Sequence, residues 1–109
     1  MKLVIAIVHD EDARPLLEEL TQKAFRVTKM ASTGGFLKSG NTTVLVGVED
    51  DEVETVKDMI QTNCKSRQQM VTSPAPVSGT TGVFVPYPVE VTVGGATVFV
   101  VDVEEYLKL

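Results

Sequence analysis

A glycine-rich stretch, residues 31–43 (ASTGGFLKSGNTT), holds residue types that could bind a planar ligand. Its paired glycines, of which Gly35 is the second, allow a sharp turn and bring backbone N–H groups close to a ligand. Phe36 and Leu37 offer an apolar platform for a flat ring. Asn41 adds an amide that both donates and accepts hydrogen bonds, which suits the edge of a purine. These residue types predict contact with a nucleobase.

The segment FRVTKMA, which precedes this stretch, has the alternation of a strand. Phe25 and Val27 would lie on one face, and Arg26 and Thr28 on the other. A guanidinium group and a hydroxyl on one face can hold a phosphate. Gly47 interrupts the following strand, where a glycine often marks the close approach of a ligand. Base platform and phosphate donors together predict a nucleotide site.

The same residues also have a purely structural explanation. The glycines could do no more than close a hairpin loop, with Phe36 and Leu37 packed in a contact between subunits. Arg26 could pair with a carboxylate instead of a phosphate. The residue types alone leave these alternatives open.

Hydrophobic periodicity places these residues in a small α+β domain. The predicted order is strand, helix, two strands, helix, a long flexible loop and a closing hairpin, at residues 2–8, 9–24, 25–31, 42–48, 51–64, 66–85 and 89–103. A short strand is also predicted near 69–72, before the main part of the loop. Gly94 and Gly95 would form the tight turn of that hairpin. The pattern is a ferredoxin-like β-α-β-β-α-β sandwich with an added C-terminal hairpin, in which both helices cover one sheet face. The other face then requires cover, which further copies of the chain would provide.

Length and charge limit the class of function. The 109 residues fit a single domain spanning 1–109, and a formal net charge of −5 argues against general nucleic-acid binding. The single Cys64 cannot form an internal disulfide, and neither a signal peptide nor a membrane-spanning run is evident. We therefore expect a soluble cytoplasmic protein without membrane insertion.

Residues suited to catalysis are few. His9 is the single histidine and is best explained as part of a helix-entry turn, while Cys64 lies on the apolar stripe of the second predicted helix. Neither has the positioned partners that acid–base or nucleophilic chemistry needs. The Cys and His residues also lack metal-ligand spacing. We expect neither catalytic residues, a metal nor a cofactor.

Three segments resemble the PII-like cyclic di-AMP receptor family, also known as the PstA or DarA proteins. They are KLVIAIVHDEDA, TKMASTGGFLKSGNTT and VPYPVEVTVGGATVFVVDV, and the resemblance covers essentially the whole chain. It implies a PII-like homotrimer that binds cyclic di-AMP between subunits and has no catalytic activity. The family also has a short loop here at 33–41 and a long loop at 66–85, whose rearrangement would pass the signal to a downstream protein that the sequence does not identify.

The resemblance also implies roles for single residues. Arg26 and Thr28 would contact the phosphate and ribose region, and the backbone around Val27 would add polar contacts. Gly47 would permit close approach. The adenine pocket would be lined by Gly35, Phe36 and Leu37, with Asn41 bonding a base edge. The alternative is a PII-like adaptor for ATP or another adenine nucleotide, but a triphosphate calls for more cations than Arg26, Lys29 and Lys38 supply.

Overall fold

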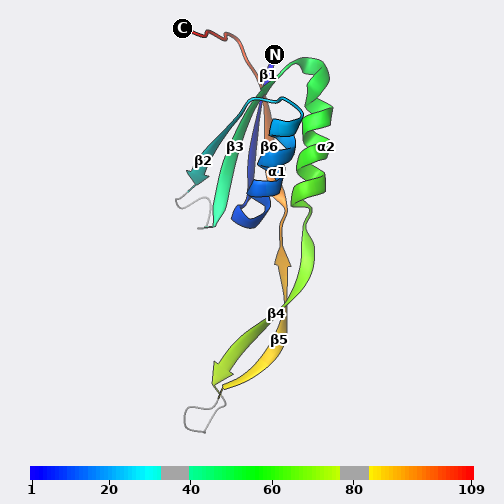
Figure 1. Cartoon of the computed structure of the whole chain (residues 1–109), viewed down its shortest axis with the longest axis vertical. Coiled ribbons are helices and arrows are strands. Elements are labelled where there is room, and N and C mark those ends of the chain that lie inside the picture. The colour runs from blue at the N-terminus through cyan, green and yellow to red at the C-terminus, as the bar shows by residue number, and fades with distance from the viewer. Residues whose placement is uncertain (33–39, 77–83) are drawn as a thin grey trace.

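The computed structural model describes residues 1–32, 40–76 and 84–109, which form a compact body and one long arm (Figure 1). The whole molecule measures 64 × 26 × 19 Å. The body contains six elements: β1 (Lys2–His9), α1 (Asp10–Gln22), β2 (Val27–Ser32), β3 (Asn41–Val48), α2 (Val53–Cys64) and β6 (Ala96–Asp102). A short 3-10 turn, η1 (Asp50–Glu52), precedes α2, and the arm consists of β4 (Arg67–Pro76) and β5 (Phe84–Val93).

The body is one antiparallel sheet of order β2-β3-β1-β6, with α1 and α2 on one face (Figure 1). This element order and sheet topology are compatible with the predicted PII-like, ferredoxin-like β-α-β-β-α-β fold. β1 and β6 lie near opposite ends of the sequence, so their pairing brings the two ends of the chain together. Lys2 forms an ion pair with Asp102, and the Val103 N–H donates to the Met1 carbonyl oxygen at 3.2 Å.

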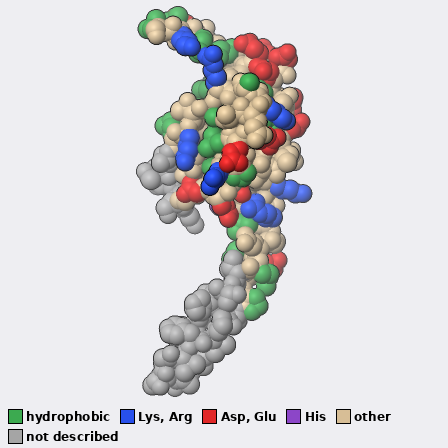
Figure 2. Space-filling model, viewed as in Figure 1, with side chains coloured by type: hydrophobic (Ala, Val, Ile, Leu, Met, Phe, Trp, Pro, Cys, Tyr) green, Lys and Arg blue, Asp and Glu red, His purple; other side chains and the backbone are tan. Residues whose placement is uncertain are grey.

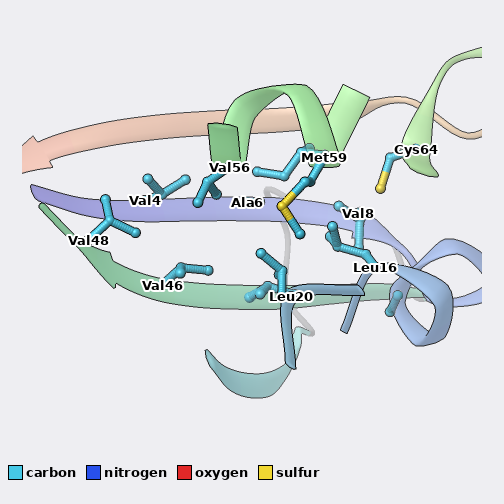
Figure 3. Close-up of a cluster of buried hydrophobic side chains, with 13 residues drawn as sticks. Val4, Ala6, Val8, Leu16, Leu20, Val46, Val48, Val56, Met59 and Cys64 are labelled. Atoms are coloured by element: carbon cyan, nitrogen blue, oxygen red, sulfur yellow. The ribbon is translucent and has the colours of Figure 1, made fainter. Parts of the chain in front are cut away.

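The core fills the space between the sheet and the two helices (Figure 3). Alternate residues of β1 and β3 point into it because successive side chains of a strand face opposite sides. The helices contribute side chains at spacings of three and four residues, which form one apolar stripe on each. The buried residues are Val4, Ala6, Val8, Ala13, Leu16, Leu20, Val44, Val46, Val48, Val56, Met59, Ile60 and Cys64.

The sheet face away from the helices is apolar and only partly covered, and we call it the open face. Leu3, Ile5 and Leu45 are half-buried there, and Ile5 lies opposite Phe99, which is exposed. A contiguous apolar surface of this kind marks a site of association or ligand binding. The requirement for cover that the sequence predicted is therefore present in the structure.

The predicted C-terminal hairpin is wrong. β5 pairs with β4 and β6 pairs with β1, so Gly94 and Gly95 connect the arm to the body instead of turning a hairpin between β5 and β6. The stretch expected to be mainly a long loop, 66–85, instead contains all of β4 and the start of β5. The short strand predicted near 69–72 lies within β4. Both strands of a two-stranded sheet have a free edge, which tolerates the prolines that suggested a loop.

Helix α1 ends in a Schellman motif built on an alanine. The Phe25 N–H donates to the Leu20 carbonyl oxygen and the Ala24 N–H to that of Thr21, both at 3.0 Å. Ala24 has a φ of 64°, in the left-handed region that glycine usually occupies at this position. The Cβ of Ala24 therefore costs about 1 kcal/mol relative to glycine.

We expect Ala24→Gly to raise the free energy of unfolding by roughly 0.5–1 kcal/mol, because it removes that steric cost. Chemical denaturation would measure the change. Ala13→Gly is the matched control, since the same substitution inside α1 should lower stability. A loss of stability in Ala24→Gly would show that the left-handed conformation carries no strain here.

Candidate functional site

A cavity of about 370 Å³ lies on the open face, at the end of the sheet where the two chain ends meet. Residues from β1, β3, the start of β2 and the C-terminal segment line it. They are Met1, Leu3, Arg26, Thr28, Leu45, Gly47, Val103 and Tyr106. We call it the open-face cavity.

The structure brings three of the predicted site residues together in this cavity. Phe25 and Val27 pack against the core, so the alternation of the strand places Arg26 and Thr28 on the opposite face. Gly47, on the adjacent β3, completes the group. Three residues picked from sequence pattern alone therefore share one hollow, although what they bind stays a prediction.

Gly47 helps to keep the cavity open, since it adds no side chain to the sheet surface. It lies directly across the ladder from Leu3. A Cβ built at Gly47 would lie 3.2 Å from Cε of Met1, the flexible tip of a side chain that also lines the cavity. A side chain at this position would thus occupy space that a ligand could use.

Among the described residues that line the cavity, Arg26 has the one charged side chain. Within the described part of the chain, no carboxylate lies within ion-pair distance of its guanidinium group. The nearby N-terminal amine differs, because it pairs with Asp50 at 3.0 Å and thereby lowers the pKa of that carboxyl group. Arg26 is thus available to an anionic ligand.

Tyr106 is a cavity residue that the sequence did not reveal. It follows β6 in the segment VEEYLKL, which resembles a solvated acidic tail, and its side chain is 57% exposed. Its position depends on the pairing of β6 with β1, which carries the C-terminal segment past Met1. A Tyr ring and hydroxyl next to Arg26 add a surface for stacking and a hydrogen-bonding group.

Asn41 is separated from the other predicted residues. It starts β3, six residues before Gly47, which corresponds to about 20 Å along a strand. It lines a second cavity of about 210 Å³ together with His9, Gly94 and Gly95. The remaining predicted residues, Gly35, Phe36 and Leu37, lie outside the described ranges, so within one chain the described candidates fall into two groups.

The Cys64 thiol has an environment that makes it a poor nucleophile. Burial raises the pKa of the Cys64 thiol to about 11, with the charge of Asp12 adding to the effect, so the thiol stays protonated at neutral pH. His9 is exposed at the N-cap of α1. Among the described residues, no three His, Cys, Asp or Glu side chains form a group that could hold a metal ion.

Comparison with known proteins shows to which family the chain belongs. A sequence profile described as cyclic-di-AMP receptor matches residues 1–109, the whole chain. The chain belongs to the cyclic-di-AMP receptor family. This bears out the resemblance that the three sequence segments carried.

A solved structure resembles this cyclic-di-AMP receptor family member over nearly its full length. It is the crystal structure of a functionally unknown protein from Pediococcus pentosaceus, with 39% sequence identity and a TM-score of 0.78. The match covers 99% of this chain and 96% of that one. The architecture of body and arm therefore has a close counterpart in a related chain.

Proposed function

We propose that this protein is a non-enzymatic receptor that binds cyclic di-AMP in the open-face cavity and relays binding to a downstream protein. The observation that carries the proposal is the convergence of Arg26, Thr28 and Gly47 in a hollow of a cyclic-di-AMP receptor family chain. Arg26 would hold a phosphate, Thr28 would hydrogen-bond the phosphate or ribose, and Tyr106 would pack on a base. Gly35, Phe36, Leu37 and Asn41 keep their proposed roles at an adenine, and the backbone near Val27 its proposed polar contacts.

The separation of the two groups of candidate residues supports binding between subunits. An assembly of copies through their open faces would cover the apolar surface around Ile5 and Phe99. In such an assembly, a ligand in the cavity of one copy could also contact residues of a neighbouring copy. We propose a homotrimer on this basis and because the PII-like resemblance implies a trimeric assembly.

The charge distribution favours a small ligand over a nucleic acid. On the face shown in Figure 2, Lys and Arg side chains are scattered among acidic ones instead of forming one basic patch. A cyclic dinucleotide carries two diester charges, which fewer cations can balance than a triphosphate requires. One free arginine per cavity suits the former better, so ATP is the ligand to use as a control.

In the described ranges, no helix is long and apolar enough to cross a membrane. We propose a cytoplasmic location, where a nucleotide second messenger would be met.

Calorimetric titration with cyclic di-AMP, with cyclic di-GMP and ATP as controls, tests the proposed function. We expect saturable binding of cyclic di-AMP alone, near one ligand per chain. Light scattering on the same sample would give the mass of the assembly. Absence of heat with cyclic di-AMP, in folded and assembled protein, would overturn the receptor proposal, and binding of ATP alone would replace it with the adaptor.

A further inference from the structure

The first turn of α1 touches two distant parts of the chain through neighbouring residues. On one side, the Asp10 N–H donates to the Gly40 carbonyl oxygen at 2.9 Å, and the Asp10 carboxylate accepts from the Thr42 hydroxyl at 2.6 Å. Thr42 is only 4% exposed while Asp10 is exposed, so this hydrogen bond is partly buried. The start of β3, which includes the candidate ligand residue Asn41, is thereby attached to α1.

On the other side, Asp12 holds the point where the arm joins the body, which we call the arm root (65–67 and 93–95). Arg67 opens β4, and its Nη2 donates to Oδ1 of Asp12 at 3.1 Å and lies 4.0 Å from Oε1 of Glu11. Its Nη1 donates to the Lys65 carbonyl oxygen at 3.1 Å. The arm root is therefore oriented by a guanidinium fork that lies against α1.

The returning strand of the arm closes tightly on the same group. The Gly95 N–H donates to the Cys64 carbonyl oxygen at the end of α2. A Cβ at Gly94 would lie 2.5 Å from Nη1 of Arg67 and 3.3 Å from Oδ2 of Asp12, so only glycine fits there. Asp12, Arg67 and Gly94 therefore lie close together at the arm root.

The carboxylate of Asp12 is also in an unfavourable environment. Its side chain is 4% exposed, and in the described part of the chain Oδ2 has no hydrogen-bond partner. A buried, unpaired polar atom is unfavourable, so a second arrangement that pairs Oδ2 would compete with this one. Two arrangements of similar free energy are what a switching element requires.

A shared cavity shows how near the two attachments are. His9 and Asn41, from the β1–β3 end, and Gly94 and Gly95, from the arm root, line the same space of about 210 Å³. The start of β3 and the arm root are thus both attached to α1, and they also line one cavity.

We propose that the Asp10–Asp12 turn is a positioning element that couples the candidate ligand residues at the start of β3 to the arm root. This inference rests on the proposed function, since it describes how cyclic di-AMP binding reaches the arm. A ligand that shifts Gly40 and Asn41 would also displace Asp10, through the hydrogen bonds of Asp10 with Gly40 and Thr42. The displacement of the turn then changes the contact of Asp12 with Arg67 and reorients the arm.

Hydrogen exchange tests this coupling at the Gly95 amide, whose N–H bonds to Cys64. In the wild-type protein, saturating cyclic di-AMP should change its exchange rate by about fivefold or more, the lower end of typical coupling between sites. Arg67→Gln and Thr42→Val cut the path at opposite ends. Thr42→Val preserves side-chain shape, and Arg67→Gln replaces the guanidinium group by a shorter, uncharged polar side chain. Each should reduce the ligand-induced change to less than about twofold and leave calorimetric affinity within about threefold of wild type.

Arg14→Gln is the matched control, because Arg14 also forms an ion pair on α1, but with Glu18 of the same helix and not with a residue of the arm root. It should keep the full response. Should Arg67→Gln fail to fold, Asp12→Asn tests the same contact with a neutral side chain of equal size. A full response in the Arg67 and Thr42 variants, or an unchanged Gly95 rate in a wild-type protein that binds, overturns the coupling and leaves the receptor intact. Absence of binding in the wild type removes both.

Discussion

Gly47→Val is expected to weaken cyclic di-AMP binding by about tenfold to a hundredfold, with the fold preserved. The new side chain would project from β3 into the open-face cavity, beside Leu3 and Arg26. Forcing a ligand into an overfilled site costs about 1–3 kcal/mol, and each 1.4 kcal/mol is tenfold in affinity. The protein itself should tolerate the change, since valine favours strands and the nearest atom to a new Cβ is the mobile Cε of Met1.

Calorimetric affinity and a thermal unfolding curve should be measured on the same sample of the Gly47→Val variant. Gly47→Ala provides a graded comparison, because its single methyl group should produce a smaller loss of affinity. Light scattering must show that both variants assemble as the wild type does. Wild-type affinity in an assembled Gly47→Val protein would mean that the ligand does not enter this cavity.

Arg26→Ala is expected to weaken binding of cyclic di-AMP by more than about tenfold, because it removes a charge-assisted hydrogen bond to phosphate. Since no described carboxylate pairs with Arg26, the substitution should leave stability almost unchanged. Arg26→Lys keeps the charge and loses the planar fork, so an intermediate affinity is expected.

Lys29→Ala is the matched control for the arginine. It removes a cation from the same strand, but strand alternation places Lys29 on the face opposite Thr28, and it does not line the cavity. Equal losses of affinity in the two variants would indicate that the overall charge of the strand attracts the ligand. A loss confined to Arg26→Ala would indicate a direct contact.

The alternation of short strands explains why the body could be predicted from sequence. Phe25 and Val27 pack on the core while Arg26 and Thr28 line the cavity, as the two-residue period requires. The helical stripe that ends at Cys64 was equally visible, because buried side chains recur at three- and four-residue spacing. These are local patterns, and local patterns are what a single sequence carries.

Apart from a short strand near 69–72, the arm was missed because its strands break the usual composition of a sheet. Pro74 lies opposite Pro86, and Thr72 lies opposite Pro88. Proline lacks the N–H that a central strand needs, but each strand here has one edge without a partner strand in its sheet. The Gly94–Gly95 pair made residues 89–103 resemble a self-contained hairpin, although the partner of β5 is β4.

The candidate site was only partly predictable, for a similar reason. Arg26, Thr28 and Gly47 lie on neighbouring strands of a hairpin, so their proximity follows from local pairing. Tyr106 joins them through the pairing of Lys2 with Asp102, at opposite ends of the chain. Asn41 and Gly47 are far apart because they lie near opposite ends of β3. The residue types alone did not predict this distance.

The arm leaves the body and returns at the same place, since Arg67 and Val93 are ladder partners directly beside the body. An excursion with adjacent ends can gain or lose pairs of residues at its far end without moving any strand that it interrupts. Relatives could therefore evolve arms of different reach, and hence different partners, on an unchanged receptor body. The same geometry makes the arm a natural point for grafting a new recognition hairpin by protein engineering.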